Sequence, residues 1–248
     1  MADTEATRVA LVTGANKGIG RAIASRLGRE GITVFVGARD VGRGHVAADQ
    51  LRAEGIDARF VQLDITDAAS VDAAAEAVTA DAGRLDILVN NAGIALEMPT
   101  SVPSTTTADT MRATYETNVF GLVTVTNAFL PLLLAAPAGR IVNLSSEVGS
   151  AAIWSDKTTP MAMFAPQVPA YGTSKAAINA LTVAYAHELR STPVKVNAVS
   201  PGHIGTDINH FAGPGTPEQG ADVVVPYALL HADGPTGGFF GEHGPVPW

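Results

Sequence analysis

The sequence of 248 residues contains no cysteine. This absence excludes disulfides, thiolate metal sites and cysteine nucleophiles together, and it fits a reducing compartment such as the cytoplasm. Charge is also scarce, and 24 acidic residues outnumber 16 Lys and Arg, for a net charge of -8. Without a Lys/Arg cluster, this balance argues against nucleic acid and anionic membrane surfaces as main partners. The six histidines show no metal-ligand spacing, so no metal is expected.

Long apolar runs are rare as well. Residues 1–8 are acidic and contain no apolar run, so we expect no signal peptide there. Residues 118–139 carry no charge and are long enough to cross a membrane. Asn118, Asn127 and Pro131 interrupt this stretch and no Lys cluster flanks it, so we predict a buried helix and no membrane association.

Short apolar runs alternate with helical patterns along the chain. The runs predict six buried strands, at residues 8–13, 32–37, 58–63, 85–89, 140–144 and 194–199. Asp40 and Asp67 are placed to cap two of the intervening helices, and a last helix is expected near residues 217–231. Continuous apolar strands are typical of a parallel sheet covered by helices on both faces. No linker appears, so we predict one doubly wound α/β domain over residues 1–248.

A glycine-rich turn joins the first predicted strand to its helix. It reads TGANKGIG over residues 13–20, with the spacing G-x-x-x-G-x-G. Glycines in such a turn let backbone N–H groups at a helix N-terminus approach a phosphate. An ordinary strand-to-helix turn has a similar composition, so this motif alone leaves both interpretations open.

The end of the second predicted strand indicates which dinucleotide fits. A site that reads the ribose hydroxyls needs an acidic residue there, whereas a site for a 2′-phosphate needs positive charge. This sequence has Ala38 followed by Arg39, and Lys17 in the glycine-rich turn adds a second cation. We therefore expect NADP(H) rather than NAD(H) as the cofactor.

Tyr171 and Lys175 lie four residues apart in a predicted helix, which places them on the same side. An ammonium beside a phenol favours the phenolate, so Lys175 is expected to lower the Tyr171 pKa and make this residue an acid–base catalyst. Ser145 and Ser146 follow the fifth strand, where open α/β sheets place their chemistry, although paired serines are also common in turns. Asn118 is unusual in a helical, apolar stretch.

Together these motifs resemble those of the short-chain dehydrogenase/reductase family. The motifs are the turn at residues 13–20, Asn91-Ala92-Gly93, Asn118, Ser146, the Tyr171/Lys175 pair and Pro201-Gly202. The stretches TGANKGIG and GARDVGRG look most like the NADPH-dependent carbonyl reductase branch, which has menthone reductase-like relatives. The resemblance covers nearly the whole chain and implies a Rossmann-type fold with a parallel seven-stranded sheet.

The resemblance also implies a role for each motif residue. Tyr171 would donate a proton to the carbonyl oxygen, Ser146 would orient that carbonyl, and Lys175 would lower the Tyr171 pKa and hold the nicotinamide ribose. Asn118 would hold a water that links Lys175 to solvent. Cofactor contacts are expected at Gly14, Asn16, Lys17, Gly18, Ile19, Gly20, Arg39, Asp64, Ile65, Asn91, Ala92, Gly93, Tyr171, Lys175, Pro201, Gly202, Ile204 and Thr206.

Two segments depart from the family pattern. Residues 147–170 form an insertion before Tyr171, about twice the usual separation, and residues 203–220 occupy the usual position of a substrate lid. Trp154 of the insertion is a candidate to contact an apolar substrate, although it would equally suit packing of a surface loop onto the core. Phe211 of the lid is a second candidate. Longer insertions here accompany monomers in the resembling branch, so a monomer, a dimer and a tetramer all remain open.

The implied reaction is the reduction of a small apolar ketone or aldehyde to an alcohol by NADPH. The same site would catalyse alcohol oxidation, so the direction is open. A nucleotide-sensing regulator without catalysis is a second alternative, but such proteins typically lose the Tyr/Lys pair, which is present here.

Overall fold

The protein folds around one twisted sheet, which a computed structural model describes for residues 7–97, 101–158 and 168–248. The strands are β1 (Val9–Thr13), β2 (Thr33–Ala38), β3 (Ala58–Gln62), β4 (Ile87–Asn90), β5 (Arg140–Leu144), β6 (Lys195–Val199), β7 (Phe239–Gly241) and β8 (Gly244–Pro245). Their order is β3-β2-β1-β4-β5-β6-β7-β8, and all neighbours are parallel except β7 and β8. The order reverses between β1 and β4, and ligands of open α/β sheets bind at that point.

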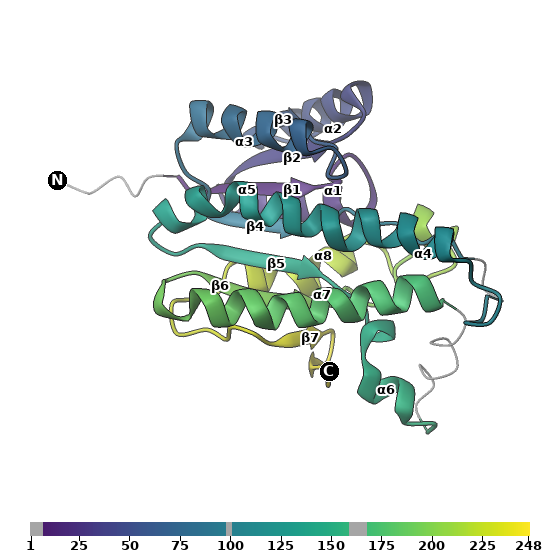
Figure 1. Cartoon of the computed structure of the whole chain (residues 1–248). Coiled ribbons are helices and arrows are strands. Elements are labelled where there is room, and N and C mark those ends of the chain that lie inside the picture. The colour runs from purple at the N-terminus through teal and green to yellow at the C-terminus, as the bar shows by residue number, and fades with distance from the viewer. Residues whose placement is uncertain (1–6, 98–100, 159–167) are drawn as a thin grey trace.

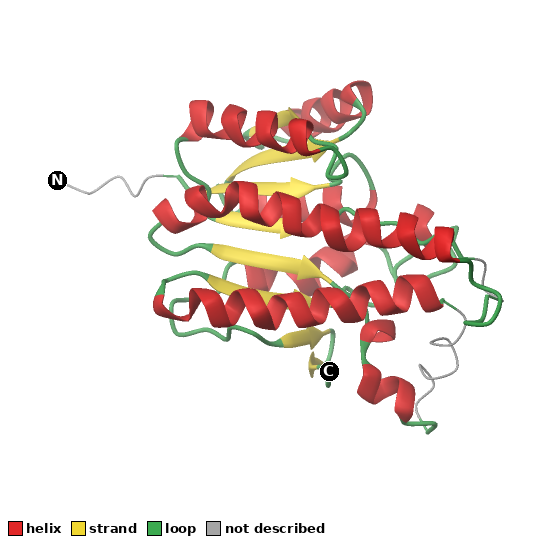
Figure 2. Ribbon diagram, viewed as in Figure 1, coloured by secondary structure: helices red, strands yellow, loops and turns green. Residues whose placement is uncertain are grey.

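Helices cover both faces of the sheet. They are α1 (Gly18–Arg29), α2 (Val41–Ala53), α3 (Ala68–Ala82), α4 (Ala108–Tyr115), α5 (Gly121–Ala135), α6 (Ala151–Ser155), α7 (Pro169–Glu188) and α8 (Pro217–Ala228). Figure 1 shows α3, α5 and α7 side by side on the near face, while α1, α2 and α8 lie behind the sheet. Figure 2 shows these helices and the sheet as three layers, and the described residues form an apolar core on each face of the sheet.

All six predicted strands are present, with ends that differ by one or two residues, and the doubly wound architecture is confirmed. The expected strand number is wrong, because the sheet has eight strands among the described residues instead of seven. The additional strand β8 has two residues and pairs antiparallel with β7 across a tight turn. A Gly-Pro pair has no strand signature, since proline donates no ladder hydrogen bond and suits only a sheet edge.

The helix ends follow from local capping. Asp40 accepts a hydrogen bond from the Arg43 backbone N–H and caps α2. Asp67 does the same for α3 through the N–H of Ala69. Both carboxylates satisfy backbone donors that the first helical turn leaves free, and both predicted caps are confirmed.

The uncharged stretch at residues 118–139 belongs to one long helical segment. α4 continues through a π-helical turn, Glu116–Phe120, into α5, and the whole segment spans Ala108–Ala135. This segment is long and apolar enough to cross a membrane, but half of its most apolar window is buried inside the protein. It packs against α3, α7 and the sheet, as the core helix of a folded domain does.

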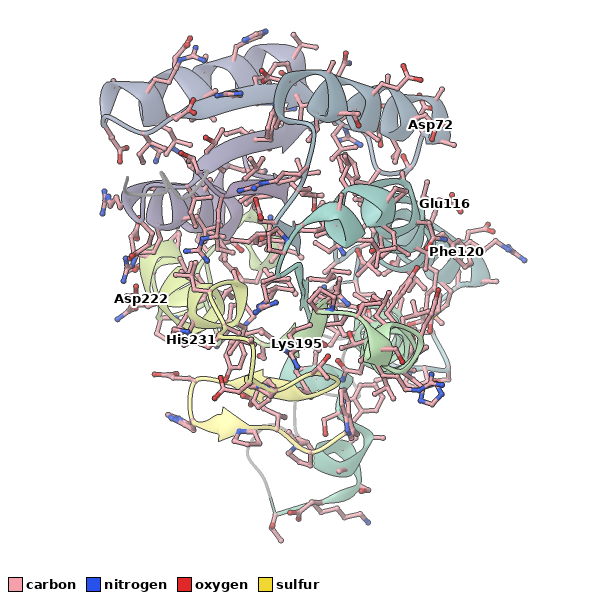
Figure 3. All side chains as sticks on the ribbon, turned by 90° about the vertical axis from the view of Figure 1, so that its left-hand side faces the viewer. Asp72, Glu116, Phe120, Lys195, Asp222 and His231 are labelled. Atoms are coloured by element: carbon pink, nitrogen blue, oxygen red, sulfur yellow. The ribbon has the colours of Figure 1, made fainter. Side chains whose placement is uncertain are left out.

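Phe129 of α5 is the largest fully buried side chain among the described residues, and it lies in the core between α5 and the sheet. We expect Phe129→Ala to lower the free energy of unfolding by about 3–5 kcal/mol, because it removes buried apolar area and leaves a cavity. Phe120→Ala is the matched control, since Phe120 is 54% exposed and lies on the outer side of the same helical segment (Figure 3). Urea denaturation measures both, and equal losses in the two variants would contradict the assigned packing.

Candidate active site

A cleft of about 520 Å³ opens where the strand order reverses. The loops that follow β1, β2, β4, β5 and β6 form its walls, so residues far apart in the sequence meet there. Sixteen of the predicted cofactor residues line it: Gly14, Asn16, Lys17, Gly18, Ile19, Gly20, Arg39, Asp64, Ile65, Asn91, Ala92, Gly93, Tyr171, Lys175, Pro201 and Thr206. The sequence motifs therefore converge on one site.

The glycine-rich turn leaves the N-terminus of α1 open toward this cleft. Gly14 and Gly18 have φ angles of 66° and 56°, which favour glycine. A Cβ at Gly20 would lie 2.4 Å from Asn91 Nδ2, so this position has no room for a side chain. Lys17 is the N-cap of α1 and makes no side-chain capping hydrogen bond. Free backbone donors at a helix N-terminus suit a phosphate, so the turn fits a dinucleotide.

Asn91 holds the turn in place. Its side-chain amide donates to the carbonyl oxygens of Thr13 and Gly14, at 2.8 and 3.4 Å. Thr13 Oγ1 in turn accepts hydrogen bonds from the backbone N–H groups of Asn91 and Ala92. The loops after β1 and β4 are thereby joined directly above the point where the strand order reverses.

Three cations surround the end of the cleft near β2. Arg39 is exposed and makes no ion pair among the residues that the structure describes. Lys17 Nζ lies 3.2 Å from a carboxylate oxygen of Asp207, a residue of the predicted lid. Arg43 also lines the cleft, although the sequence analysis did not single it out, and it pairs with Asp40. Of these side chains, Arg39 is the one free to meet an additional anion.

Helix α7 carries Tyr171 and Lys175 into the cleft. Lys175 is 4% exposed, and its Nζ donates to the carbonyl oxygen of Leu144 at 2.8 Å. The same Nζ lies 5.4 Å from the centroid of the Tyr171 ring. The predicted pairing on one helix face is present, with the ammonium anchored to the last residue of β5.

Burial controls the acid–base properties of this pair. Desolvation raises the Tyr171 pKa to about 12, and a hydrogen bond with Ser146 acts in the opposite direction. Desolvation also lowers the pKa of Lys175 to about 8. The expected low pKa of Tyr171 is therefore wrong in direction, because loss of hydration outweighs any attraction between the phenolate and the Lys175 ammonium. At neutral pH the phenol carries its proton and is a donor.

The two serines after β5 have different partners. Ser145 is buried, and its Oγ donates to Asn179 Oδ1 at 2.6 Å. Ser146 Oγ is hydrogen-bonded with Tyr171 and accepts a bond from the N–H of Val148 at 3.4 Å. Ser145 lines the cleft and Ser146 does not, whereas Ser146 is the serine whose hydrogen bond acts on the Tyr171 phenol.

Asn118 lies in the π-helical turn, a feature that often marks functional sites. The Asn118 side chain is 1% exposed. Its Oδ1 accepts a hydrogen bond from the Ile94 N–H at 2.8 Å, and its Nδ2 donates to the Ile94 carbonyl oxygen at 2.9 Å. It also donates to Ser174 Oγ at 3.0 Å. Its Oδ1 lies close to Gly93, as does Lys175 Nζ, so Asn118 and Lys175 approach the same point of the loop after β4.

Six predicted residues lie outside the cleft lining, and two of them are Asn118 and Ser146, described above. Trp154 of the insertion packs its indole ring on Gly172, and residues 159–167 of that insertion lie outside the described residues. Phe211 is 68% exposed. Gly202 directly follows the lining residue Pro201, and Ile204 is buried against Gly220.

The cleft also contains apolar residues that the sequence analysis missed. Leu96 and Ile208 line it and are 52% and 37% exposed, and Ile94 and Ala95 extend this apolar side. None of them belongs to a recognisable motif. Only the neighbouring motif residues Asn91-Ala92-Gly93 and Thr206 could have indicated them.

Comparison with known proteins identifies the family. The short chain dehydrogenase family matches residues 8–216. The chain belongs to the short chain dehydrogenase family. Carbonyl reductase [NADPH] 1 of Sus scrofa is 36% identical over 290 residues, which cover 98% of this chain and 94% of that protein.

Two solved structures of short chain dehydrogenases extend the likeness. NADPH-bound carbonyl reductase from chicken fatty liver is similar with a TM-score of 0.84 and 28% identity, covering 98% of this chain and 99% of that one. Salutaridine reductase from Papaver somniferum gives a TM-score of 0.80 and 32% identity, covering 95% and 99%. The likeness therefore spans the whole fold.

Burial of Lys175 makes stability depend on pH. Its pKa falls from 10.5 to about 8 on folding, so between these values the unfolded chain binds more protons and stability at this site rises with pH. We expect Lys175→Met to stabilise the protein more at pH 7 than at pH 10, where the native lysine is already neutral.

Urea unfolding of both proteins at both pH values measures this difference. Lys157→Met, at an exposed lysine, is the control and should show no such trend. A stability gap between Lys175→Met and wild type that widens with pH would contradict the assigned burial.

Proposed function

We propose that the protein reduces the carbonyl group of a small, predominantly apolar ketone or aldehyde, with NADPH as the cofactor. The observation that carries this proposal is the meeting of Tyr171 and buried Lys175, with Ser146 hydrogen-bonded to Tyr171, at the cleft that contains the glycine-rich turn and Arg39. The carbonyl reductases among the relatives, whose names include NADPH, support the same reaction and cofactor.

The cofactor end of the cleft has donors and charges that suit NADPH. The N-terminus of α1 would hold the pyrophosphate, and Arg39 would bind the 2′-phosphate. Lys17 would also bind the 2′-phosphate, which would compete with Asp207 for the Lys17 ammonium. Lys175 and Asn91 would contact the two riboses, Asp64 would face the adenine, and Thr206 the carboxamide. When bound, NADPH supplies the hydride, and the protein supplies orientation and electrostatics.

Tyr171 supplies the proton. Its phenol is protonated at neutral pH and donates to the carbonyl oxygen as negative charge develops there. Ser146, hydrogen-bonded with Tyr171, orients the same oxygen. The Lys175 ammonium stabilises the phenolate that remains, because an opposite charge in a buried site lowers its free energy. Asn118 would hold the water through which a proton returns.

The apolar side of the cleft favours an apolar substrate. Leu96 and Ile208 line it and are exposed, so contact with apolar substrate surface would remove them from water. Ile208 belongs to residues 203–220, which we propose as a substrate lid. Its neighbours Thr206 and Asp207 line the same cleft, and the Lys17–Asp207 ion pair links this segment to the glycine-rich turn.

Replacing the proposed proton donor tests the mechanism. We expect Tyr171→Phe to lower kcat for carbonyl reduction by at least about 100-fold, because general acid catalysis contributes on that order. The dissociation constant for NADPH should stay within about twofold of wild type, since few cofactor contacts are lost. Tyr185→Phe is the matched control, because this tyrosine of α7 binds Asn127 instead. Substantial activity in Tyr171→Phe would refute the mechanism.

Charge reversal at Arg39 tests the cofactor assignment. We expect Arg39→Asp to raise the dissociation constant for NADPH by about 100-fold, because it replaces a charged hydrogen bond to phosphate with repulsion. The affinity for NADH, which lacks the 2′-phosphate, should not fall. Arg190→Asp, in the turn Leu189–Ser191 that follows α7, makes the same charge change as a control. Fluorescence titration measures both cofactors, and unchanged NADPH affinity would remove Arg39 from the site.

A further inference from the structure

The N-terminus of α7 lacks a local cap, although Tyr171 lies in its first turn. The N-cap residue is Val168, whose side chain cannot accept a hydrogen bond, and Pro169 has no N–H. The N–H of Gly172 already donates to the carbonyl oxygen of Val168 at 2.7 Å. The first turn therefore contains two backbone donors that need a partner, those of Ala170 and Tyr171.

Glu97 satisfies both of them from a distant part of the chain. One carboxylate oxygen accepts from the N–H of Ala170 at 2.6 Å, and the other accepts from the N–H of Tyr171 at 2.7 Å. Such hydrogen bonds to a carboxylate are short and strong, and its negative charge is favoured at a helix N-terminus. Glu97 thus does for α7 what Asp40 and Asp67 do locally for α2 and α3.

The other side of the Tyr171 backbone is held from the same loop. The carbonyl oxygen of Tyr171 accepts from Ser174 Oγ at 2.7 Å, and Ser174 Oγ accepts from Asn118 Nδ2 at 3.0 Å. Asn118 in turn binds both backbone groups of Ile94. Ile94 and Glu97 belong to the loop after β4, so this loop restrains Tyr171 through its N–H and through its C=O.

We propose that Glu97 is a positioning residue for Tyr171, an inference that rests on the proposed function of Tyr171 as proton donor. Ile94, Ala95 and Leu96 line the cleft immediately before it. The carboxylate of Glu97 itself binds the helix backbone. It fixes the first turn of α7, and with it the Cα–Cβ direction of Tyr171, relative to the loop that borders cofactor and substrate. Misplacement of a reacting group by about 1 Å can cost about 100-fold in rate.

The experiment separates positioning from folding. We expect Glu97→Ala to lower kcat by about 10- to 100-fold, while the NADPH dissociation constant and Tm change little. Glu97→Gln should retain an intermediate kcat, because its amide carbonyl accepts one of the two bonds and its NH₂ group cannot accept the other. Glu76→Ala, at an exposed glutamate of α3, is the control and should leave kcat unchanged.

Hydrogen–deuterium exchange gives a readout independent of activity. The amides of Ala170 and Tyr171 should exchange faster in Glu97→Ala, while the last turns of α7 remain protected as in wild type. Unchanged exchange at these amides in Glu97→Ala, or an unchanged kcat, would overturn the inference. A loss of NADPH affinity and Tm that accompanies the loss of kcat would also overturn it. Wild type without carbonyl turnover, or an active Tyr171→Phe, would instead refute the proposed function.

Discussion

The hydrogen bond from Lys175 Nζ to the carbonyl oxygen of Leu144 is the contact on which the site depends. It joins the middle of the sheet to α7 and draws an ammonium into a buried position. The same burial lowers the Lys175 pKa to about 8 and raises that of Tyr171 to about 12. A protonated phenol and a nearby cation are what carbonyl reduction needs, because the charge that develops on oxygen must be both protonated and balanced.

The loop after β4 brings the two halves of the cleft together. At its start, Asn91 holds the glycine-rich turn through Thr13 and Gly14. At its end, Glu97 holds the first turn of α7. The glycine-rich turn and Tyr171, the proposed proton donor, are thus fixed to one short segment, which begins where the strand order reverses. This arrangement explains how a cofactor and an acid that belong to distant motifs can be held in one geometry.

Local chemistry made much of this structure predictable from the sequence. Strands buried on both faces are continuous apolar runs, and caps such as Asp40 act within three residues. The two-residue strand β8 has no such signature. Glu97 was missed because its partners lie 73 and 74 residues away, and the Tyr171 pKa was misjudged because burial is a property of the folded chain. Contacts between distant segments leave no periodic pattern in the sequence.

The most direct test of the account is the rate of NADPH oxidation at 340 nm with a panel of apolar ketones, aldehydes and quinones, with NADH in parallel. The account predicts turnover with NADPH and little with NADH, with apolar carbonyl compounds as the better substrates. Equal rates with both cofactors would contradict the role of Arg39. Tight NADPH binding without turnover of any carbonyl compound would contradict the central claim that Tyr171 and Lys175 form a working catalytic pair.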